Sequence, residues 1–484
     1  MTKKKQILHA SIWVGVERFS QQGIQFFVSI LLARLLTPSE FGLVAMISIF
    51  MAFSTHLING GFQSALIQKK NATHIDESTA FWFNLLISAV MTFSLFFAAP
   101  WIARFFNQPR LIAITQWSSF NLLLTGFSVV QFALLQKEFL IKKRAIVTVL
   151  SVAVGGIISI IMAFKGYGVW ALVALGLGVN FSRVIFVWIL HAWRPAFIFS
   201  WDSFKSLFGF GSRLLGASLM TAIYENIYQL IIGKMYTASD LGFFQRAKRF
   251  MMLCSYTPIA MITQIHFPYL CKLQDDREAV KKTFSKSLKY SVMATLPVLV
   301  GLGVAAPNFI IFLVGSKWLP SVPYLQIMCA TGIIYVAYMM NLDVIKALGY
   351  SGQLLKVELF KRILLGISIV LLYRFGIIAL LYGEVVCSFI AMIIVARMLY
   401  RHIKVGILIQ FRWLASCFIS ATLMGVIVYF SNVSFLSHGQ ALFLQITLGG
   451  LVYFGLLFIL RDQELLFVVK KGSELLMRKL NRNG

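Results

Sequence analysis

Long apolar segments recur along the whole chain, and they constrain its fold more than any other feature of the sequence. Runs of about 18 or more mostly apolar residues are long enough to cross about 30 Å of hydrocarbon as helices. The 484-residue chain is 59% hydrophobic and 13% charged, whereas a soluble chain has about a quarter charged residues. A membrane β-barrel would instead show alternating segments of about ten residues. The sequence therefore predicts an all-α polytopic membrane protein.

Fourteen membrane-spanning helices fit the apolar runs. Their approximate positions are residues 11–36, 40–62, 79–105, 111–135, 142–164, 168–191, 204–233, 240–270, 284–313, 321–346, 353–373, 376–400, 412–431 and 440–460. An even number of spans returns the C-terminus to the side on which the chain begins. Most of the 44 Lys and Arg residues fall on that side, and the opposite loops hold Arg104, Arg110, Lys165, Lys234, Lys317 and Arg374. By the positive-inside rule, both termini are predicted to be cytoplasmic.

The net charge of +27 arises from the basic loops on the side of the termini. In a soluble protein it would suggest a nucleic-acid partner, but here it follows from the basic loops, so no nucleic-acid partner is expected. The five cysteines form no CxxC pair and the histidines show no ligand spacing. No disulfide framework or metal site is predicted, and His56, His191 and His266 are interpreted as satisfied structural residues.

The connections between the predicted spans are short. No loop is long enough for a soluble catalytic domain or for the large outer loop of a sugar polymerase, and the chain has no GxxxxGK[ST] phosphate loop. We therefore expect a protein that is not an enzyme and has no catalytic residues.

A turn motif occurs twice, 200 residues apart. Residues 37–42 read Thr-Pro-Ser-Glu-Phe-Gly, and residues 237–242 read Thr-Ala-Ser-Asp-Leu-Gly. Each copy follows one long apolar segment and precedes the next, on the face opposite the termini. The repeat predicts two homologous six-helix lobes related by an axis along the membrane normal.

The repeat also divides the chain. The predicted lobes are residues 1–192 and 204–403, and residues 404–460 form two additional transmembrane helices. Residues 461–484 mix leucines with basic residues, which is typical of an amphipathic helix on the anionic inner leaflet.

Polar residues persist inside several predicted spans, although a charge within the membrane costs about 2.5–3.5 kcal/mol. Glu17, Gln21 and Gln25 recur every fourth residue on one helix face, and Thr221, Glu225 and Gln229 do so on the equivalent helix of the repeat. We expect the two faces to line a central cavity with a surplus of positive charge, suited to an anionic or phosphate-bearing substrate. The alternative is that these groups pair internally and hold helices together. The predicted substrate-binding residues are Arg18, Gln21, Gln25, Arg213, Glu225, Asn226, Gln229, Arg246, Lys248 and Arg249.

Several short motifs resemble those of the polysaccharide-transporter family. They are residues 34–42 (RLLTPSEFG), 65–70 (ALIQKK), 81–82 (FW), 168–172 (GVWAL), 193–195 (WRP), 232–234 (IGK), 246–247 (RA), 267–268 (FP), 273–277 (LQDDR) and 347–349 (ALG). Between about residues 10 and 400 the chain is most similar to the colanic-acid and teichuronic-acid exporter branch of the Wzx-type flippases. That family lies within the multidrug, oligosaccharidyl-lipid and polysaccharide exporter superfamily.

The resemblance implies two six-helix lobes around a central cavity, followed by two extra helices. It implies that undecaprenyl-pyrophosphate-linked oligosaccharide repeat units move from the cytoplasmic to the outer leaflet of a bacterial inner membrane by alternating access. The product would be an exopolysaccharide, an O-antigen of lipopolysaccharide, or a capsule. The implied partners are this lipid-linked oligosaccharide, membrane lipids, and the polysaccharide polymerase and export machinery. No cofactor is expected beyond coupling to a Na⁺ or H⁺ gradient.

The chain departs from the family pattern at two positions. Asn59, before Gly60-Gly61-Phe62, and Tyr228, in Asn226-Ile227-Tyr228, stand where related sequences often carry an acid. Two carboxylates that could bind a coupling ion are absent. The remaining ion-coupling candidates are Glu17, Glu225 and Glu358.

Three other functions remain open. A drug exporter of the same superfamily would favour an acidic cavity, whereas the predicted one has more bases than acids. A membrane glycosyltransferase or polymerase subunit is disfavoured by the short loops. A flippase for a cell-wall lipid precursor has the same pyrophosphate and sugar chemistry, and the charge pattern does not separate the two.

Overall fold

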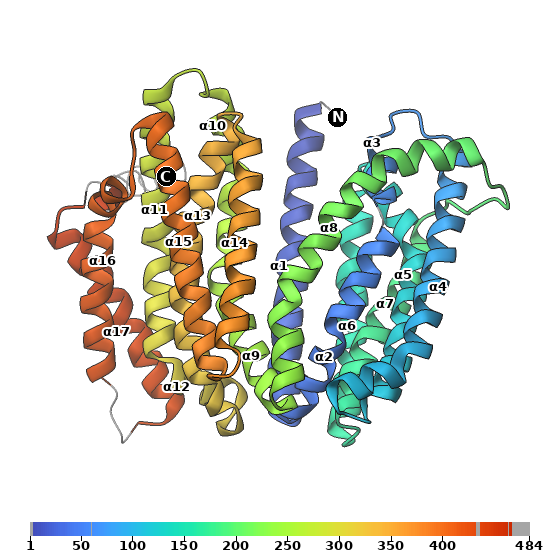
Figure 1. Cartoon of the computed structure of the whole chain (residues 1–484), viewed down its shortest axis with the longest axis horizontal. Helices are drawn as coiled ribbons and strands as arrows, with labels where there is room; N and C mark the ends of the chain where they lie inside the picture. Colours follow the sequence, from blue (N-terminus) through green and yellow to red (C-terminus); the bar gives the residue numbers. More distant parts are fainter. Residues whose placement is uncertain (1–2, 60, 432–435, 463, 467–484) are drawn as a thin grey trace, which may run out of the picture. The chain divides into compact units, whose positions relative to one another are not determined.

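The structure, a computed structural model, describes residues 3–59, 61–431, 436–462 and 464–466. Within these ranges every regular element is a helix and no strand is present (Figure 1). The all-α prediction is confirmed. The chain forms two compact units, Met1–Gln245 and Arg246–Gly484, here called unit one and unit two.

Unit one is a bundle of long helices with one short helix. It consists of α1 (Lys3–Leu35), α2 (Pro38–Asn59), α3 (Phe62–Gln68), α4 (His74–Phe106), α5 (Leu111–Lys137), α6 (Ile141–Phe164), α7 (Val169–Leu190), α8 (Trp201–Met235) and the first part of α9 (Ala238–Cys254). α1 packs on α6, α4 packs on α5, and α7 packs on both α5 and α6. α8, which the repeat assigns to the second lobe, packs on α2, α3 and α4 of unit one.

Unit two is organised around α13. Its elements after α9 are α10 (Tyr256–Lys272), α11 (Arg277–Val304), α12 (Ala306–Val314), the 3-10 helix η1 (Ser316–Ser321), α13 (Val322–Ala347), α14 (Ser351–Leu372), α15 (Ile377–Ile403), α16 (Ile407–Phe430) and α17 (His438–Ile459). α13 packs on α10, α11 and α15, while α16 packs on α11 and α17.

The observed helices follow the predicted spans closely, with three exceptions. The predicted span 40–62 ends at Asn59 and is followed by α3, the span 240–270 is interrupted at Ser255, and the span 284–313 is interrupted at Ala305. The break at Ala305 coincides with Pro307, which lies in the first turn of the helix that follows, a position that proline favours. Ten helical segments of the described chain are long and apolar enough to cross a membrane, and the count of fourteen stays a prediction.

Both copies of the repeated turn begin a helix with a reciprocal cap. In the first copy, the backbone N–H and the hydroxyl of Thr37 donate to Glu40 Oε2 at 2.7 and 2.9 Å, and the Glu40 N–H donates to Thr37 Oγ1 at 3.4 Å. In the second copy, Thr237 and Asp240 make the same three bonds, at 3.1, 2.7 and 3.1 Å. Each threonine–acid pair satisfies N–H groups that a helix start otherwise leaves open. The turn is therefore a helix-start device used at α2 and again at α9.

The boundary between the compact units falls inside α9. The predicted lobes, 1–192 and 204–403, describe a repeat in the sequence, and they stay a prediction. Of the predicted basic tail, the described residues are 461, 462 and 464–466. The predicted amphipathic helix otherwise lies outside the described residues.

Candidate functional site

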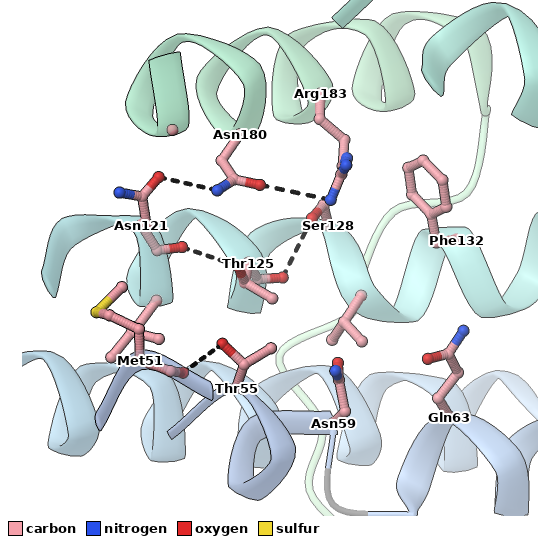
Figure 2. Close-up of a pocket in the computed structure, with 13 residues that line it drawn as sticks. Met51, Thr55, Asn59, Gln63, Asn121, Thr125, Ser128, Phe132, Asn180 and Arg183 are labelled. Atoms are coloured by element: carbon pink, nitrogen blue, oxygen red, sulfur yellow. Dashed lines mark hydrogen bonds between the residues drawn. The ribbon is translucent and has the colours of Figure 1, made fainter. Parts of the chain in front are cut away.

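Unit one contains a polar cavity of about 440 Å³ between α2, α3, α5 and α7 (Figure 2). Its polar lining consists of amides, hydroxyls and one guanidinium, from Thr55, Asn59, Gln63, Asn121, Thr125, Ser128, Asn180 and Arg183. Met51, Leu122, Val129, Phe132 and Gly176 complete the wall. The lining therefore combines polar groups with apolar side chains.

A chain of side-chain hydrogen bonds crosses from α5 to α7 along one wall (Figure 2). Asn180 Nδ2 donates to Asn121 Oδ1 at 2.8 Å, and Arg183 Nη1 donates to Asn180 Oδ1 at 3.4 Å. Asn180 and Arg183 are neighbours on α7 because residues three apart share a helix face. A Cβ built on Gly176 would lie 3.3 Å from the Asn121 amide, so the glycine leaves room for that amide between the helices.

The hydroxyls of the lining use their hydrogens on their own helices. Thr55 donates to the Met51 carbonyl at 2.8 Å, Thr125 to the Asn121 carbonyl at 2.8 Å, and Ser128 to the Thr125 carbonyl at 3.1 Å (Figure 2). A hydroxyl that donates in this way keeps its lone pairs as acceptors. The cavity wall therefore offers hydroxyl acceptors beside amide groups.

Arg183 is the only formally charged residue of the described lining. Its guanidinium carbon lies 5.4 Å from the centroid of the Phe132 ring, and its buried Nε has no hydrogen-bond partner among the described residues. Glu17 is close enough to interact with it electrostatically. That carboxylate is itself bonded to α6, through Arg144 Nε at 3.3 Å and Thr148 Oγ1 at 3.1 Å. Arg183 thus presents a positive charge with spare donor capacity to a cavity whose described lining contains no carboxylate.

The sequence contained a signal for this cavity that the prediction did not use. Asn121 and Thr125 are four residues apart, and Asn180 and Arg183 are three apart, each pair inside an apolar run. The same spacing of polar residues drew attention to the first predicted helix. What the spacing does not reveal is that α5 and α7 are packing partners.

On α1, the predicted site residues lie outside the described cavity lining. Glu17 is buried and bonded to α6 as described, Arg18 is exposed, and Gln21 and Gln25 are half-buried. α1 packs on α6. Glu17, predicted as an ion-coupling candidate, thus contributes to the contact between these two helices.

The predicted residues of α8 have separate surroundings. Glu225 is exposed, and Asn226 donates to the Ala222 carbonyl of its own helix at 2.8 Å. Gln229 is buried and accepts a hydrogen bond from the Ser48 hydroxyl of α2, so it joins two helices. Arg213 belongs to α8, but its side chain lies outside the described residues.

The predicted residues of unit two are also dispersed. Arg246 is buried with its guanidinium 4.8 Å from the centroid of the Trp318 ring, Lys248 is half-buried, and Arg249 is exposed. Glu358 accepts from the Tyr338 hydroxyl at 2.7 Å and lies 4.0 Å from Arg362. The predicted central cavity, lined by residues of both halves, stays a prediction.

The fold and the cavity define a multi-pass helical membrane protein with a cavity of mixed polar and apolar lining in one of its two units. Residues 31–323 match the family described as polysaccharide biosynthesis protein, and the chain belongs to that family. This match confirms the resemblance inferred from the short motifs.

Curated relatives agree with the family assignment. The chain is 24% identical over 475 residues to the teichuronic acid biosynthesis protein TuaB of Bacillus subtilis (strain 168), covering 97% of this chain and 98% of the relative. It is 24% identical to the succinoglycan biosynthesis transport protein ExoT of Rhizobium meliloti (strain 1021), covering 71% of this chain and 69% of that relative. It is also 24% identical to the lipopolysaccharide biosynthesis protein WzxC of Escherichia coli (strain K12), covering 69% and 68%.

Two solved structures show the same fold. One is the lipid II flippase MurJ in an inward closed conformation, with a TM-score of 0.74, 15% identity, and 93% and 99% of the two chains covered. The other is an inward-facing multidrug resistance MATE family transporter of the MOP superfamily, with a TM-score of 0.60, 14% identity, and 82% and 99% covered. These likenesses confirm the predicted fold class, a helical membrane protein of two lobes.

Proposed function

We propose that the protein is a flippase that moves lipid-linked oligosaccharide repeat units across the membrane for the biosynthesis of a surface polysaccharide. Membership of the polysaccharide biosynthesis family and relatives named as transport proteins support transport in this process. The observation that carries the proposal is the lining of the cavity in unit one, where the described residues supply amides, hydroxyls and Arg183 but no carboxylate.

This lining suits a sugar better than a cationic drug. Asn121, Asn180 and the hydroxyls supply donors and acceptors for sugar hydroxyls, and Phe132 offers an aromatic face to the apolar side of a sugar ring. Arg183 adds a charge-assisted donor for a phosphate or an acidic sugar. A cation would meet like charge at Arg183 and no acidic counterion in the described lining, which disfavours a drug exporter.

The lipid, the direction and the energy source are further parts of the proposal. The cargo would be linked to undecaprenyl pyrophosphate and would pass from the cytoplasmic to the outer leaflet of a bacterial inner membrane by alternating access. Both termini would be cytoplasmic, a Na⁺ or H⁺ gradient would drive the cycle, and no covalent chemistry would be involved. The polymerase that consumes the flipped unit would be a functional partner.

A deletion strain carrying variants of Arg183 tests the proposal. Loss of the protein should deplete the surface polymer and cause an intact lipid-linked repeat unit to accumulate, measured by mass spectrometry of extracted lipids. Arg183→Gln should reduce the polymer at least tenfold with normal amounts of protein in the membrane, and Arg183→Lys should retain part of it because the charge remains.

The matched control is Arg104→Gln, which removes an exposed arginine from α4 of the same unit and should leave the polymer unchanged. Normal polymer in the deletion strain, without any accumulating intermediate, would overturn the flippase proposal. Accumulation of the cell-wall precursor instead would reassign the cargo to that lipid.

A further inference from the structure

Two ionisable side chains of unit two are buried against each other without a hydrogen bond. His266 on α10 and Asp343 on α13 are each 5% exposed, and His266 Nδ1 lies 3.6 Å from Asp343 Oδ2. Neither ring nitrogen of His266, nor Asp343 Oδ2, has a hydrogen-bond partner among the described residues. The interpretation of His266 as a satisfied structural residue is therefore wrong.

Such an arrangement is costly in a protein interior. Burial of an ionised carboxylate costs several kcal/mol unless a partner compensates for the lost water. Buried polar side chains are usually paired by hydrogen bonds. In the same unit, for example, Asn341 and Gln410 exchange two amide hydrogen bonds of 2.9 and 2.8 Å. Intramembrane histidines and acids that lack such partners are typical of proton pathways.

Charged groups on the elements that pack against α10 and α13 have other contacts or are exposed. On α11, Lys289 binds Asp462 at 2.7 Å and Lys281 lies 3.4 Å from Glu278. On α14, Glu358 accepts from Tyr338, and Lys361 lies over the Tyr338 ring. On α15, Glu384 interacts electrostatically with Lys248 and Lys361. The exposed basic residues are Lys272, Arg277, Lys282, Lys286, Lys317, Lys346, Lys356, Arg397 and Arg401.

We propose that His266 and Asp343 form a proton-binding site inside unit two. With a neutral imidazole and an ionised carboxylate, the pair has a net charge of −1. Uptake of one proton by the imidazole gives an imidazolium–carboxylate pair of zero net charge. The new N–H faces the carboxylate, and a closure from 3.6 Å to about 2.8 Å would make a charge-assisted hydrogen bond.

The helix that carries His266 has two features that permit the His266–Asp343 distance to shorten. α10 is a separate 17-residue helix that begins after the break at Ser255. Pro268, two residues after His266, lies inside α10 and lacks the N–H that would bond to the carbonyl of Gln264. A proline at this position permits a helix to bend. Protonation of the pair would therefore draw this part of α10 towards α13.

The geometry favours a proton over a metal cation. A hard cation such as Na⁺ requires several oxygen ligands, whereas Asp343 faces an imidazole nitrogen. The described residues contain no cluster of three or more His, Cys, Asp or Glu side chains that could hold a metal ion. Glu358 accepts a hydrogen bond from Tyr338. Glu17 accepts from Arg144 and Thr148 through Oε1, although its Oε2 has no partner among the described residues.

The direct test is a titration of the purified full-length protein in detergent, with histidine labelled by ¹³C and ¹⁵N for NMR. The His266 signal is assigned from its loss in His266→Gln. Between about pH 4 and pH 9 this signal should show uptake of one proton. Asp343→Asn should lower the proton affinity of His266 about tenfold, because the carboxylate that stabilises the imidazolium is gone. Asp343→Glu, which keeps the charge, should retain most of the affinity and serves if Asp343→Asn fails to fold.

Asn341→Ala is the matched control, since it disrupts a buried polar pair two residues from Asp343 without removing a titratable group. It should destabilise the protein and leave the His266 titration in place. A His266 signal that stays in one protonation state, or that titrates identically in Asp343→Asn, would overturn the proton-binding site. A His266 signal that shifts on addition of NaCl but not of choline chloride would assign the site to sodium instead.

Proton binding by the pair does not depend on the cargo, and its use as a transport step rests on the proposed function. In the deletion strain, His266→Gln and Asp343→Asn should flatten the dependence of polymer export on external pH. A normal titration with an unchanged export profile would refute only that coupling. A normal titration in a protein whose deletion leaves the polymer intact would refute only the cargo.

Discussion

Gly42 and Gly242 lie reciprocally against the first residues of each other's helices. A Cβ built on Gly42 would lie 1.7 Å from the carbonyl oxygen of Ala238, the first residue of α9. A Cβ built on Gly242 would lie 2.0 Å from the carbonyl oxygen of Pro38, the first residue of α2. Pro38 and Ala238 occupy the same position in the two copies of the turn. Such an exchange of equivalent contacts is typical of copies related by a two-fold axis.

Replacement of either glycine should destabilise the protein. In Gly42→Ala and Gly242→Ala, the added methyl meets backbone, which cannot rotate away as the end of a long side chain can. Overpacking of this kind costs about 1–3 kcal/mol, so the midpoint of thermal unfolding in detergent should fall for each variant.

The control for both substitutions is Gly23→Ala in α1, where an added Cβ meets no described atom within 4 Å. It should be neutral or slightly stabilising, because alanine favours a helix over glycine by about 1 kcal/mol. If Gly42→Ala unfolds at the same temperature as Gly23→Ala, the close approach of the two turns does not exist in solution.

The repeated turn was predictable because it combines a local signal with a fixed spacing. Thr37 with Glu40, and Thr237 with Asp240, follow the capping-box pattern, which depends only on residues three apart. The helices were predictable for a similar reason, since a membrane-spanning segment must be both apolar and about 20 residues long. The break at Ser255 was not predicted, because the apolar composition continues across it.

The cavity was not predicted because it depends on which helices are neighbours. Asn121 and Asn180 are 59 residues apart in sequence, and only the packing of α5 on α7 brings them together. Periodicity indicates that each residue lies on a polar face of its helix, but it does not identify the helix against which that face packs. The same limit applies to Gln229, whose partner Ser48 is 181 residues away, and to the His266–Asp343 pair.

The Asn121–Asn180 hydrogen bond should be measurable as a coupling energy. Asn121→Ala and Asn180→Ala, alone and combined, form a double-mutant cycle across the cavity wall. We expect a coupling of about 0.5–1.5 kcal/mol in the free energy of unfolding, because each single change removes the same 2.8 Å bond. Asn121→Ala combined with Asn341→Ala, in the other unit, should be additive. Additivity in the Asn121–Asn180 cycle would contradict the contact.

The buried ion pair between Glu17 and Arg144 should respond unequally to loss of its two partners. The Glu17 side chain is 7% exposed and the Arg144 side chain 27% exposed. Arg144→Met leaves a buried carboxylate without the cation that is bonded to it, a change that typically costs about 3–5 kcal/mol. The electrostatic interaction of Glu17 with Arg183 remains and offsets part of that cost. Glu17→Gln should cost less, since Arg144 reaches solvent and still donates to Gln136 Oε1 at 3.0 Å.

The combined Glu17→Gln, Arg144→Met variant should recover part of the stability lost in Arg144→Met. All three variants are compared by the midpoint of thermal unfolding in the same detergent at neutral pH. Equal losses from the two single changes would mean that the Glu17 carboxylate is hydrated in solution, against the burial found here.

Asp462, which follows α17, should make the stability of unit two depend on pH in the acidic range. Burial alone would raise the pKa of this carboxyl, but hydrogen bonds from Lys289 and Ser416 outweigh it and hold the pKa below its ordinary value of 3.8. The Lys289 ammonium lies 2.7 Å from Asp462 Oδ2, and the Leu465 N–H donates to Oδ1 at 3.3 Å. These bonds join the end of α17 to α11 and α16.

A carboxyl whose pKa is lower in the folded than in the unfolded protein contributes its full stability above the unfolded value. This contribution is lost as the pH falls below about 4, through the folded pKa. Asp462→Asn should therefore lower the unfolding midpoint at neutral pH, where it leaves the Lys289 ammonium, whose side chain is 17% exposed, without its carboxylate. The difference from the wild type should shrink as the pH falls below about 4 and the wild-type carboxyl takes up its proton. Asp275→Asn, which removes an exposed acid near the start of α11, should parallel the wild type at each pH, and a parallel curve for Asp462→Asn would exclude the ion pair as a source of stability.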